Sequence, residues 1–378
     1  MANDKHDSTN EPLDRRRFLG KAAAAATVSL AACGDAGEGG PAVQTNPRVQ
    51  WRLASSFPPN LDALYGASER LSERVAALTE GRFTIRPYPA GEIVPAFEVM
   101  DAAQQGTVQV GHSASYYFTG KNPVLAFDTG VPFGLTSRQQ MAWLNVGGGQ
   151  ELMQEVFSDF GIVIFPGGNT GAQMGGWFKR EVNSAAGLRG LKMRIPGLGG
   201  EVMDRLGVTV QNLAGGEIYP ALERGVIDAT EWVGPYDDEK LEFHRAARFY
   251  YYPGWWEPGP SMSFYVNRTA WDSLPSVYQE AFRAATVWAG YATQLIYDAQ
   301  NPAALKRLVD GGVQLRRFSD DILVAAHTAA RAIQEENAAA NASYRKVYDA
   351  WKIFRDQSFS WFGTAEQAFA EFAFTRTG

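Results

Sequence analysis

The order of hydrophobic and polar positions predicts strands and helices that alternate along most of the chain. Residues 49–54 alternate apolar and polar side chains as a half-buried strand does, and a loop containing Ser, Pro and Asn follows at 55–60. Within 61–79, apolar residues recur at helical intervals from Leu64 to Leu78. The same patterns predict further strands at 82–87, 108–112, 162–166, 192–195, 208–211 and 229–233, and further helices at 96–106, 137–159, 199–206 and 217–224. This alternation favours an α/β fold, in which ligands bind at the carboxyl ends of strands.

The final third of the chain changes character and becomes mostly helical. Helical spacing predicts segments at 275–297, 302–310 and 319–354, and a last piece from 364 onward. The helical region between 319 and 377 is rich in Ala and carries aromatic residues that we expect on its surface, namely Trp351, Phe359, Trp361 and Phe362. No internal repeat occurs along the chain.

The first 32 residues form a targeting segment. Three arginines at 15–17 and Lys21 precede an apolar run from 22 to 32, which is the order of an export signal. The run has about eleven residues, whereas a membrane-spanning helix needs ~20. The arginines followed by Phe-Leu resemble a twin-arginine signal, although Asp14 stands where that motif usually has Ser or Thr.

The single cysteine, Cys33, lies directly after the apolar run in the sequence Leu-Ala-Ala-Cys-Gly. This arrangement resembles a bacterial lipoprotein box, in which the thiol accepts the lipid. The alternative is a chance cysteine in an Ala-rich signal. Lipid chains at Cys33 would hold the protein at a membrane surface. Residues 33–47 are rich in Gly, Ala, Pro and Asn and read as a flexible tether.

Size and charge narrow the function classes. The folded part from residue 48 onward has roughly 330 residues, which is typical of two lobes or one large α/β unit. The whole chain has a net charge of −6, and removal of the signal takes away more basic than acidic residues. Because no Lys/Arg cluster is present, a nucleic-acid partner is not expected. An anionic ligand therefore needs a local positive site.

Four motifs in order, at 169–178, 190–197, 225–232 and 252–257, resemble the extracytoplasmic solute-binding subunits of TRAP transporters. That family includes keto-acid, lactate and dicarboxylate binders. The resemblance covers nearly all of the chain after the signal. It implies a two-lobed periplasmic-binding-protein-like α/β fold with a hinge and a central cleft, and TRAP membrane permease subunits as partners.

The resemblance also implies bounds for the two lobes. Lobe I is expected at 48–166 plus about 254–290, and lobe II at 167–253 plus about 291–378, including the C-terminal helices. In close relatives a terminal helix exchange builds a dimer, which would bury the C-terminal aromatics. The other interpretation is that these aromatics pack on their own lobe.

Arg194 is the principal candidate for binding an anion. It lies in an apolar strand that is expected to be buried, and a buried guanidinium needs an anion beside it. Pro196 and Gly197 follow and would open the strand end to a cleft. In the resembled family the matching arginine holds the ligand carboxylate, which its planar fork can bind by two hydrogen bonds. The alternative is an internal ion pair with Asp or Glu.

The resemblance further implies a metal ion that bridges protein and ligand. Its ligands would be the side chains of Gln173, Glu231 and Glu257 and the backbone carbonyl of Trp232. Hard oxygens of this kind suit Na+ or Ca2+ rather than zinc. Two glutamates, a ligand carboxylate and Arg194 sum to −2, which a divalent ion would neutralise. The alternatives are a salt bridge for Glu231 and a solvated loop position for Glu257.

Other residues would complete the pocket. By resemblance, Tyr116 and Tyr117 would offer hydroxyl or backbone donors, unless one of them is simply part of the core. Apolar walls are expected from Phe57, Trp232 and either Trp255 or Trp256, although each Trp could equally lie in the core. Asn212 is a weaker candidate for a keto or hydroxy oxygen. The expected ligand is a small 2-oxo or 2-hydroxy monocarboxylate resembling pyruvate or lactate, bound without bond breaking.

Catalysis finds little support in the sequence. The three histidines after the signal have no motif context, and neither a nucleophile elbow nor a phosphate-binding Gly-Lys-Ser/Thr loop occurs. We therefore predict a binding protein and not an enzyme. Two alternatives remain open, a secreted metal-dependent enzyme acting on a carboxylate and a ligand-sensing receptor subunit.

Overall fold

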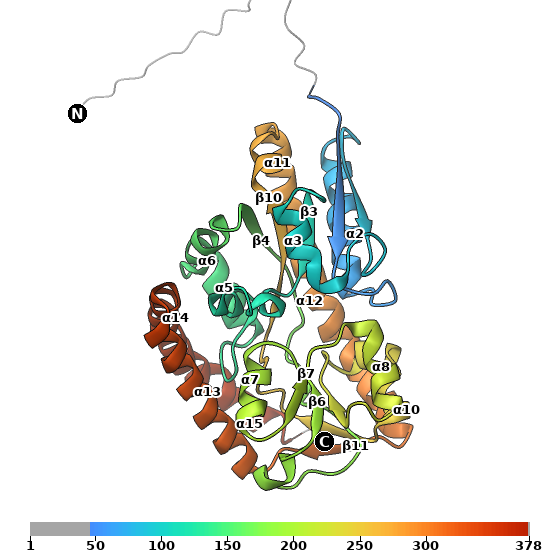
Figure 1. Ribbon diagram of the computed structural model, residues 1–378, viewed down its shortest axis with the longest axis vertical. Helices are drawn as coiled ribbons and strands as arrows, with labels where there is room; N and C mark the ends of the chain where they lie inside the picture. Colours follow the sequence, from blue (N-terminus) through green and yellow to red (C-terminus); the bar gives the residue numbers. More distant parts are fainter. Residues whose placement is uncertain (1–45, 377–378) are drawn as a thin grey trace, which may run out of the picture. The chain divides into compact units, whose positions relative to one another are not determined.

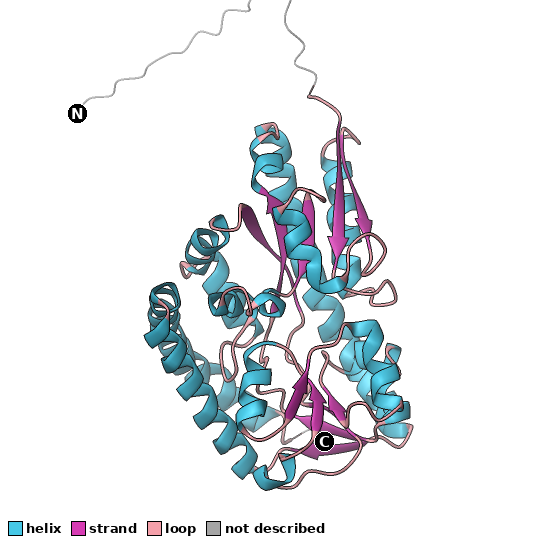
Figure 2. Ribbon diagram, viewed as in Figure 1, coloured by secondary structure: helices cyan, strands magenta, loops and turns pink. Residues whose placement is uncertain are grey.

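The computed structural model describes residues 46–376, which form two β-sheets with helices around them (Figures 1 and 2). The predicted signal at 1–32, Cys33 and nearly all of the predicted tether lie outside the described residues. Across residues 46–376, no helix is long and apolar enough to cross a membrane.

The first sheet has the strand order β2-β1-β3-β10-β4. β1 pairs in parallel with β2 and β3, and β10 runs antiparallel between β3 and β4. The strands are β1 (Val49–Ser55), β2 (Phe83–Tyr88), β3 (Val110–Ser113), β4 (Ile162–Asn169) and β10 (Ser261–Asn267). We call this sheet and the helices around it the first lobe.

The second sheet has the order β11-β9-β5-β8-β6-β7. Its strands are short: β5 (Gly176–Phe178), β6 (Lys192–Arg194), β7 (Thr209–Gln211), β8 (Ala229–Thr230), β9 (Phe249–Tyr252) and β11 (Gln314–Arg317). We call this sheet and its helices the second lobe. The chain passes between the sheets in the β4–β5 loop, in the β9–β10 loop and along one long helix, α12 (Ser276–Asp310). The mixed α/β architecture predicted from the sequence is confirmed, while the residue bounds of the two lobes stay a prediction.

The remaining helices follow in chain order. Those before β5 are α2 (Leu64–Leu78), η1 (Ala96–Glu98), α3 (Val99–Gln104), η2 (Ser115–Phe118), η3 (Pro123–Leu125), α4 (Ala126–Thr129), α5 (Ser137–Asn145) and α6 (Gly149–Ser158). Those between β5 and α12 are η4 (Ala185–Leu188), α7 (Gly197–Arg205), α8 (Gly215–Glu223), α9 (Pro235–Lys240), α10 (Phe243–Ala246) and α11 (Arg268–Asp272). The last are α13 (Asp320–Ala340), α14 (Ala342–Phe362), the π-helical η5 (Gly363–Gln367) and α15 (Ala368–Ala373).

Several predicted helix bounds are wrong, each for a local reason. The helix predicted at 137–159 is two helices, because Gly148 takes a left-handed conformation with φ of 84° between α5 and α6. The segment predicted at 319–354 divides at Asn341, whose side chain accepts a hydrogen bond from the Tyr344 amide and caps α14. Conversely, the helices predicted at 275–297 and 302–310 are one helix that continues through Pro302.

Four of the observed strands were not predicted, namely β5, β9, β10 and β11. β10 is buried at every position from Ser261 to Val266 because it lies between β3 and β4. A strand buried on both faces has no period-two alternation, so its pattern does not distinguish it from other apolar segments.

The C-terminal helices divide between the lobes. α13 packs on α7 of the second lobe, whereas α14 packs on α5 and α6 of the first. The expectation that Trp351 is exposed is wrong: because α14 packs on the first lobe, Trp351 is buried beside Phe127, with ring centroids 5.6 Å apart. Phe362, also expected on the surface, is half-buried. Phe359 and Trp361 of the same helix are exposed, as expected from the sequence.

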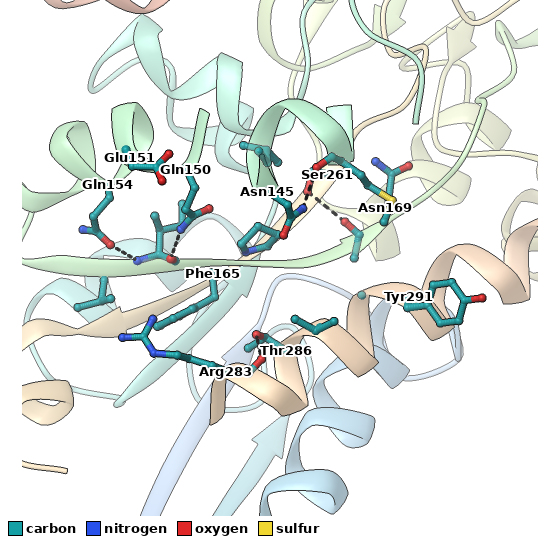
Figure 3. A pocket seen from close by; sticks show the side chains of 18 of the residues that line it. Asn145, Gln150, Glu151, Gln154, Phe165, Asn169, Ser261, Arg283, Thr286 and Tyr291 are labelled. Carbon is teal, nitrogen blue, oxygen red and sulfur yellow. Dashed lines mark hydrogen bonds between the residues drawn. The ribbon is translucent and has the colours of Figure 1, made fainter. Parts of the chain in front are cut away.

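β4 is an edge strand, and side chains of α6 form hydrogen bonds with backbone groups on its outer edge (Figure 3). The Gln150 amide donates to the Ile164 carbonyl at 2.6 Å, and the Gln154 amide donates to the Ile162 carbonyl at 2.9 Å. The Ile164 amide in turn donates to Gln154 Oε1 at 3.1 Å. This part of the sheet edge therefore has its hydrogen bonds satisfied from within the chain.

Candidate functional site

Neighbouring strands of the second sheet bring Arg194 and Glu231 together. Arg194 ends β6 and pairs across the sheet with Thr230 of β8, so Glu231 follows directly beside it. The chain turns away after Arg194 at Pro196 and Gly197, which begin α7. A Cβ at Gly197 would lie 2.9 Å from Cβ of Tyr116, so this end of the second sheet meets η2 of the first lobe.

The guanidinium of Arg194 is buried and has a partner on every nitrogen. Nη1 donates to both the side-chain Oε1 and the backbone carbonyl of Glu231, the carbonyl at 3.1 Å. Nε donates to the Leu213 carbonyl at 3.0 Å, and Nη2 lies 3.4 Å from the Tyr117 hydroxyl. The internal ion pair that the sequence left open is thus formed, and Tyr117 stands at the side of the guanidinium that faces the first lobe.

Three side-chain oxygens in this region are buried without a hydrogen-bond donor among the described residues: Gln173 Oε1, Glu231 Oε2 and Glu257 Oε2. Each comes from a different loop, respectively between β4 and β5, after β8 and between β9 and β10. A buried acceptor without a partner is costly, and a carboxylate more so than an amide. Hard, unpartnered oxygens from several loops are the donor set that Ca2+ or Na+ takes.

This set contains two carboxylates and one amide. It is therefore not a cluster of three His, Cys, Asp or Glu side chains, and no such cluster arranged for a metal ion occurs anywhere in residues 46–376. A cation here would depend on the Gln173 amide oxygen and on backbone carbonyls as well as on the two glutamates, and the family resemblance implies the Trp232 carbonyl as one of them.

Burial dominates the electrostatics of the two glutamates. It raises the pKa of Glu231 to about 7, while Arg194 opposes the shift and Asp238 adds to it. Burial and then the charge of Glu231 raise the pKa of Glu257 well above its usual range, and the side chains of Tyr116 and Gln173 oppose this. The protein alone therefore disfavours two negative charges at this place, and a bound cation would favour them.

Glycines allow the loops to come this close. A Cβ at Gly254 would lie 2.6 Å from the Gln173 carbonyl, and one at Gly176 would lie 2.3 Å from the Thr230 carbonyl. Gly176 also has a φ of 86°, which side chains rarely adopt. The loops that carry the three oxygens thus pack backbone against backbone.

A small cavity of about 10 Å³ adjoins these groups, which is room for roughly one water molecule. Five of the residues predicted from the sequence line it: Phe57, Tyr116, Tyr117, Gln173 and Trp232. Four further residues that the sequence analysis did not single out also line it: Leu64, Thr170, Val233 and Met262. Thr170 lies inside one of the four family motifs. Leu64 shows only the helical spacing of an apolar residue, and Met262 lies in β10, a strand that the sequence does not predict.

The structure does not bring every candidate to the cavity lining. Arg194, Glu231 and Glu257 are not lining residues, although Arg194 contacts Tyr117 and Trp232, which are. Asn212 is exposed at the end of β7 and does not line it. Trp255 and Trp256 are buried, with Trp255 stacked on Phe133 at 5.1 Å, and neither lines the cavity. Both tryptophans therefore lie in the core, the alternative to a pocket wall that the sequence left open.

A family model described as "Bacterial extracellular solute-binding protein, family 7" matches residues 54–341. The chain belongs to this family. This solute-binding protein is 52% identical over 363 residues to the monocarboxylate 2-oxoacid-binding periplasmic protein of Nostoc sp., an alignment covering 96% of this chain and 99% of the relative. Its function is thus that of an extracytoplasmic binding subunit of a transporter, and not that of an enzyme.

Solved structures agree with this family assignment. A TRAP transporter solute-binding protein from Bordetella bronchiseptica is 44% identical, with a TM-score of 0.86 over 87% of this chain and 98% of that one. It is described as a mixed-occupancy dimer with copurified calcium and picolinate in one active site. A TRAP periplasmic solute-binding protein from Pseudoalteromonas atlantica, with bound sodium and pyruvate, is 41% identical, with a TM-score of 0.83 over 86% of this chain and 99% of that one.

This solute-binding protein also has a larger groove, of about 980 Å³, that shares no lining residue with the small cavity. Its walls come from α5, α6, the edge of β4 and one face of α12 (Figure 3). The α12 wall includes Val287 and Tyr291, which are both more than half exposed.

Proposed function

We propose that this protein captures a small 2-oxo or 2-hydroxy monocarboxylate such as pyruvate or lactate, together with a Ca2+ or Na+ ion, for a TRAP-type transporter. The observation that carries the proposal is the buried Arg194 guanidinium beside three buried oxygens that lack a hydrogen-bond donor within residues 46–376. The guanidinium could bind a carboxylate, and the three oxygens could hold a cation beside it. A ligand with a second oxygen next to its carboxylate could contact both.

In this proposal Arg194 binds the ligand carboxylate by exchanging its side-chain contact with Glu231 for the ligand. Gln173, Glu231, Glu257 and the Trp232 carbonyl would hold the cation, which would supply positive charge to two adjacent ligand oxygens. Tyr117, already 3.4 Å from Arg194 Nη2, would orient the same carboxylate. Selection of 2-substituted acids over simple fatty acids follows because only the former present two chelating oxygens.

The cavity must widen to hold the proposed ligand. Its present volume of about 10 Å³ does not hold even a three-carbon acid, so the lobes must separate for entry and the walls must adjust on closure. Leu64, Val233 and Met262, together with Phe57 and Trp232, form the apolar part of the lining and would face the ligand's carbon chain.

Thermal unfolding with and without ligands tests this proposal. The panel comprises 2-oxo, 2-hydroxy, simple fatty, dicarboxylic and aromatic acids, each with Ca2+, with Na+ and with a chelator. A ligand at 100 times its Kd contributes ~2.7 kcal/mol, which raises the melting temperature by several degrees. Arg194→Ala should abolish the shift, whereas Arg205→Ala, a control at an exposed arginine of α7, should keep it. No shift with any carboxylate would contradict the proposal.

We propose TRAP membrane permease subunits as the partners of the loaded protein, since the family and its TRAP relatives support that assignment. Uptake of labelled pyruvate by cells expressing the permease should require this protein and should fail with Arg194→Ala. Uptake that is unchanged without the protein would contradict this assignment.

We also propose that the twin-arginine signal exports the chain and that Cys33 carries a lipid, so that the protein is held at the periplasmic membrane surface. The support is the sequence Leu-Ala-Ala-Cys directly after the apolar run. Membrane fractionation and mass spectrometry of the N-terminal peptide test this. Cys33→Ser should release the protein from the membrane fraction, and a processed, unlipidated N-terminus in the unsubstituted protein would overturn the assignment.

Finally, we propose a homodimer that buries the C-terminal aromatics. Five of them are more than 40% exposed: Phe359, Trp361, Phe369, Phe372 and Phe374. Exposed apolar side chains in this number mark an association surface. Sedimentation should show a dimer that Trp361→Glu together with Phe369→Glu dissociates. A monomer at micromolar concentration would exclude this proposal.

A further inference from the structure

A direct bridge joins the two lobes beside the small cavity. Asp62 lies in the first lobe, in the loop between β1 and α2, and Tyr236 and Lys240 lie one turn apart on α9 of the second lobe. The Tyr236 hydroxyl donates to Asp62 Oδ2 at 2.8 Å, and the Lys240 ammonium donates to Oδ1. The ammonium also lies 3.5 Å from the centroid of the Tyr236 ring, so the cation is held by both partners.

The first-lobe side of this bridge is fixed by the chain around it. Arg70 of α2 donates to the Asp62 carbonyl at 3.0 Å and to the Ala63 carbonyl at 2.7 Å. The same guanidinium donates to Thr293 of α12 at 2.9 Å. The loop that presents the Asp62 carboxylate is therefore tied to two helices.

The second-lobe side is fixed as well, because α9 is bound to α12. The Tyr236 amide donates to Asn301 Oδ1 at 3.0 Å, and the Tyr297 hydroxyl donates to Asp237 at 2.6 Å. Both sides are thus held by α12, at Thr293 for the first lobe and at Tyr297 and Asn301 for the second, so the Asp62 contacts break when the lobes turn relative to each other about this helix.

The bridge adjoins the ligand cavity on both sides. Leu64, two residues after Asp62, and Val233, three residues before Tyr236, both line the cavity. Burial opposes ionisation of Asp62, yet Lys240 and Tyr236 outweigh it and hold the pKa of Asp62 below its usual value. The carboxylate is therefore charged, and the ion pair is formed, at neutral pH.

We propose that Asp62, Tyr236 and Lys240 form a closure latch that holds the lobes together and slows release of the bound acid. The three side chains bond to one another across the lobes and none of them lines the cavity, so in this proposal they act as positioning residues. The part that concerns release rests on the proposed carboxylate-binding function. A contact made only when the lobes are closed raises the closed population, which lowers the apparent Kd and acts mainly on dissociation.

Stopped-flow tryptophan fluorescence with pyruvate and Ca2+ measures both rates. With Asp62 60% exposed, the ion pair itself is expected to contribute modestly, and the Tyr236 hydrogen bond adds to it. Asp62→Asn and Lys240→Met should each raise the dissociation rate about three- to tenfold and leave the association rate unchanged. The dissociation rate of the double variant should not exceed that of the faster single variant, as expected for two residues that contact each other. Asp310→Asn, which breaks an exposed ion pair within α12, is the matched control and should change neither rate.

A second experiment needs no ligand and so separates this inference from the proposed function. Spin labels at Ala77→Cys and Arg224→Cys, exposed positions of the first and second lobe, report the distance between lobes in a Cys33→Ser background. Asp62→Asn should shift the ligand-free distribution towards longer distances, and Tyr236→Phe should do so to a lesser extent. If pyruvate does not bind but this shift occurs, the latch stands and the ligand assignment fails. Unchanged distances in all variants, or a fall in association rate alone, would overturn the latch.

Discussion

Replacing Glu257 by Gln should stabilise the protein without a cation and weaken it as a cation binder, two effects of opposite sign. Glu257 is 4% exposed, its Oε2 has no hydrogen-bond donor among the described residues, and the nearby Arg194 is already paired with Glu231. Burial and the charge of Glu231 raise the pKa of Glu257 well above its usual range, so the folded protein without a cation holds this carboxyl protonated, at a cost in stability. Glu257→Gln removes that cost while keeping the shape of the side chain, but it cannot supply the negative charge that a bound cation would favour.

The magnitudes follow from these contacts. Relief of the cost of burying this carboxyl without a hydrogen-bond donor is worth about 1–3 kcal/mol, so the melting temperature in chelator should rise by roughly 2–4 °C or more. Even residues that only orient a metal ligand change affinity by about 10–100-fold, so loss of a direct ligand should weaken Ca2+ binding by about 100-fold or more. Isothermal titration of Ca2+ with and without pyruvate, beside differential scanning calorimetry, measures both. Glu151→Gln, at an exposed acid of α6, is the control. A lower melting temperature in chelator with unchanged Ca2+ affinity would refute this account of the site.

Three further substitutions probe other parts of the structure. Leu64→Ala should enlarge the apolar part of the cavity and raise the affinity for 2-oxobutanoate relative to pyruvate about tenfold, measured by titration; an unchanged ratio would show that Leu64 does not limit chain length. Trp351→Ala should cost about 3–5 kcal/mol in urea unfolding because the indole is buried beside Phe127; a loss below 1 kcal/mol would contradict that packing. Asp128→Asn should make the protein more stable at pH 7, by up to about 3 kcal/mol, because burial raises the pKa of Asp128 to about 6 and its ionisation on raising the pH destabilises the fold. That gain should vanish below pH 4, and an equal gain at both pH values would exclude the titration.

Site residues that follow directly from a motif were the most accessible to sequence analysis. Arg194 and Glu231 stand at the ends of short strands, and the sheet pairing of β6 with β8 places them side by side. The motifs do not show that Arg194 and Glu231 contact each other, because the pairing of strands far apart in the sequence depends on the whole sheet. For the same reason Met262, on a strand without alternation, was not foreseen as part of the cavity lining.

Local patterns predicted most helices but not where they break or join. Gly148 and Asn341 divide predicted helices through backbone conformation and capping, and both residue types carry that information in the sequence. Pro302 gave the opposite error, because α12 continues through it while packed on α9 and β4. A helix-interior proline costs about 3 kcal/mol, and tertiary contacts along a helix of 35 residues outweigh it.

The glutamines that bond the outer edge of β4 restrict how this protein can associate. An open sheet edge is a template for strand addition and for cross-β growth, a hazard for any chain that must cross a membrane and work unprotected outside the cell. With the Ile162 carbonyl and both backbone groups of Ile164 bonded to Gln150 and Gln154, this stretch offers no ladder to an incoming strand. Any partner that enters the adjoining groove must therefore be recognised through side chains, as a helix is. The apolar walls of the groove can then serve in assembly without offering the sheet edge for strand addition.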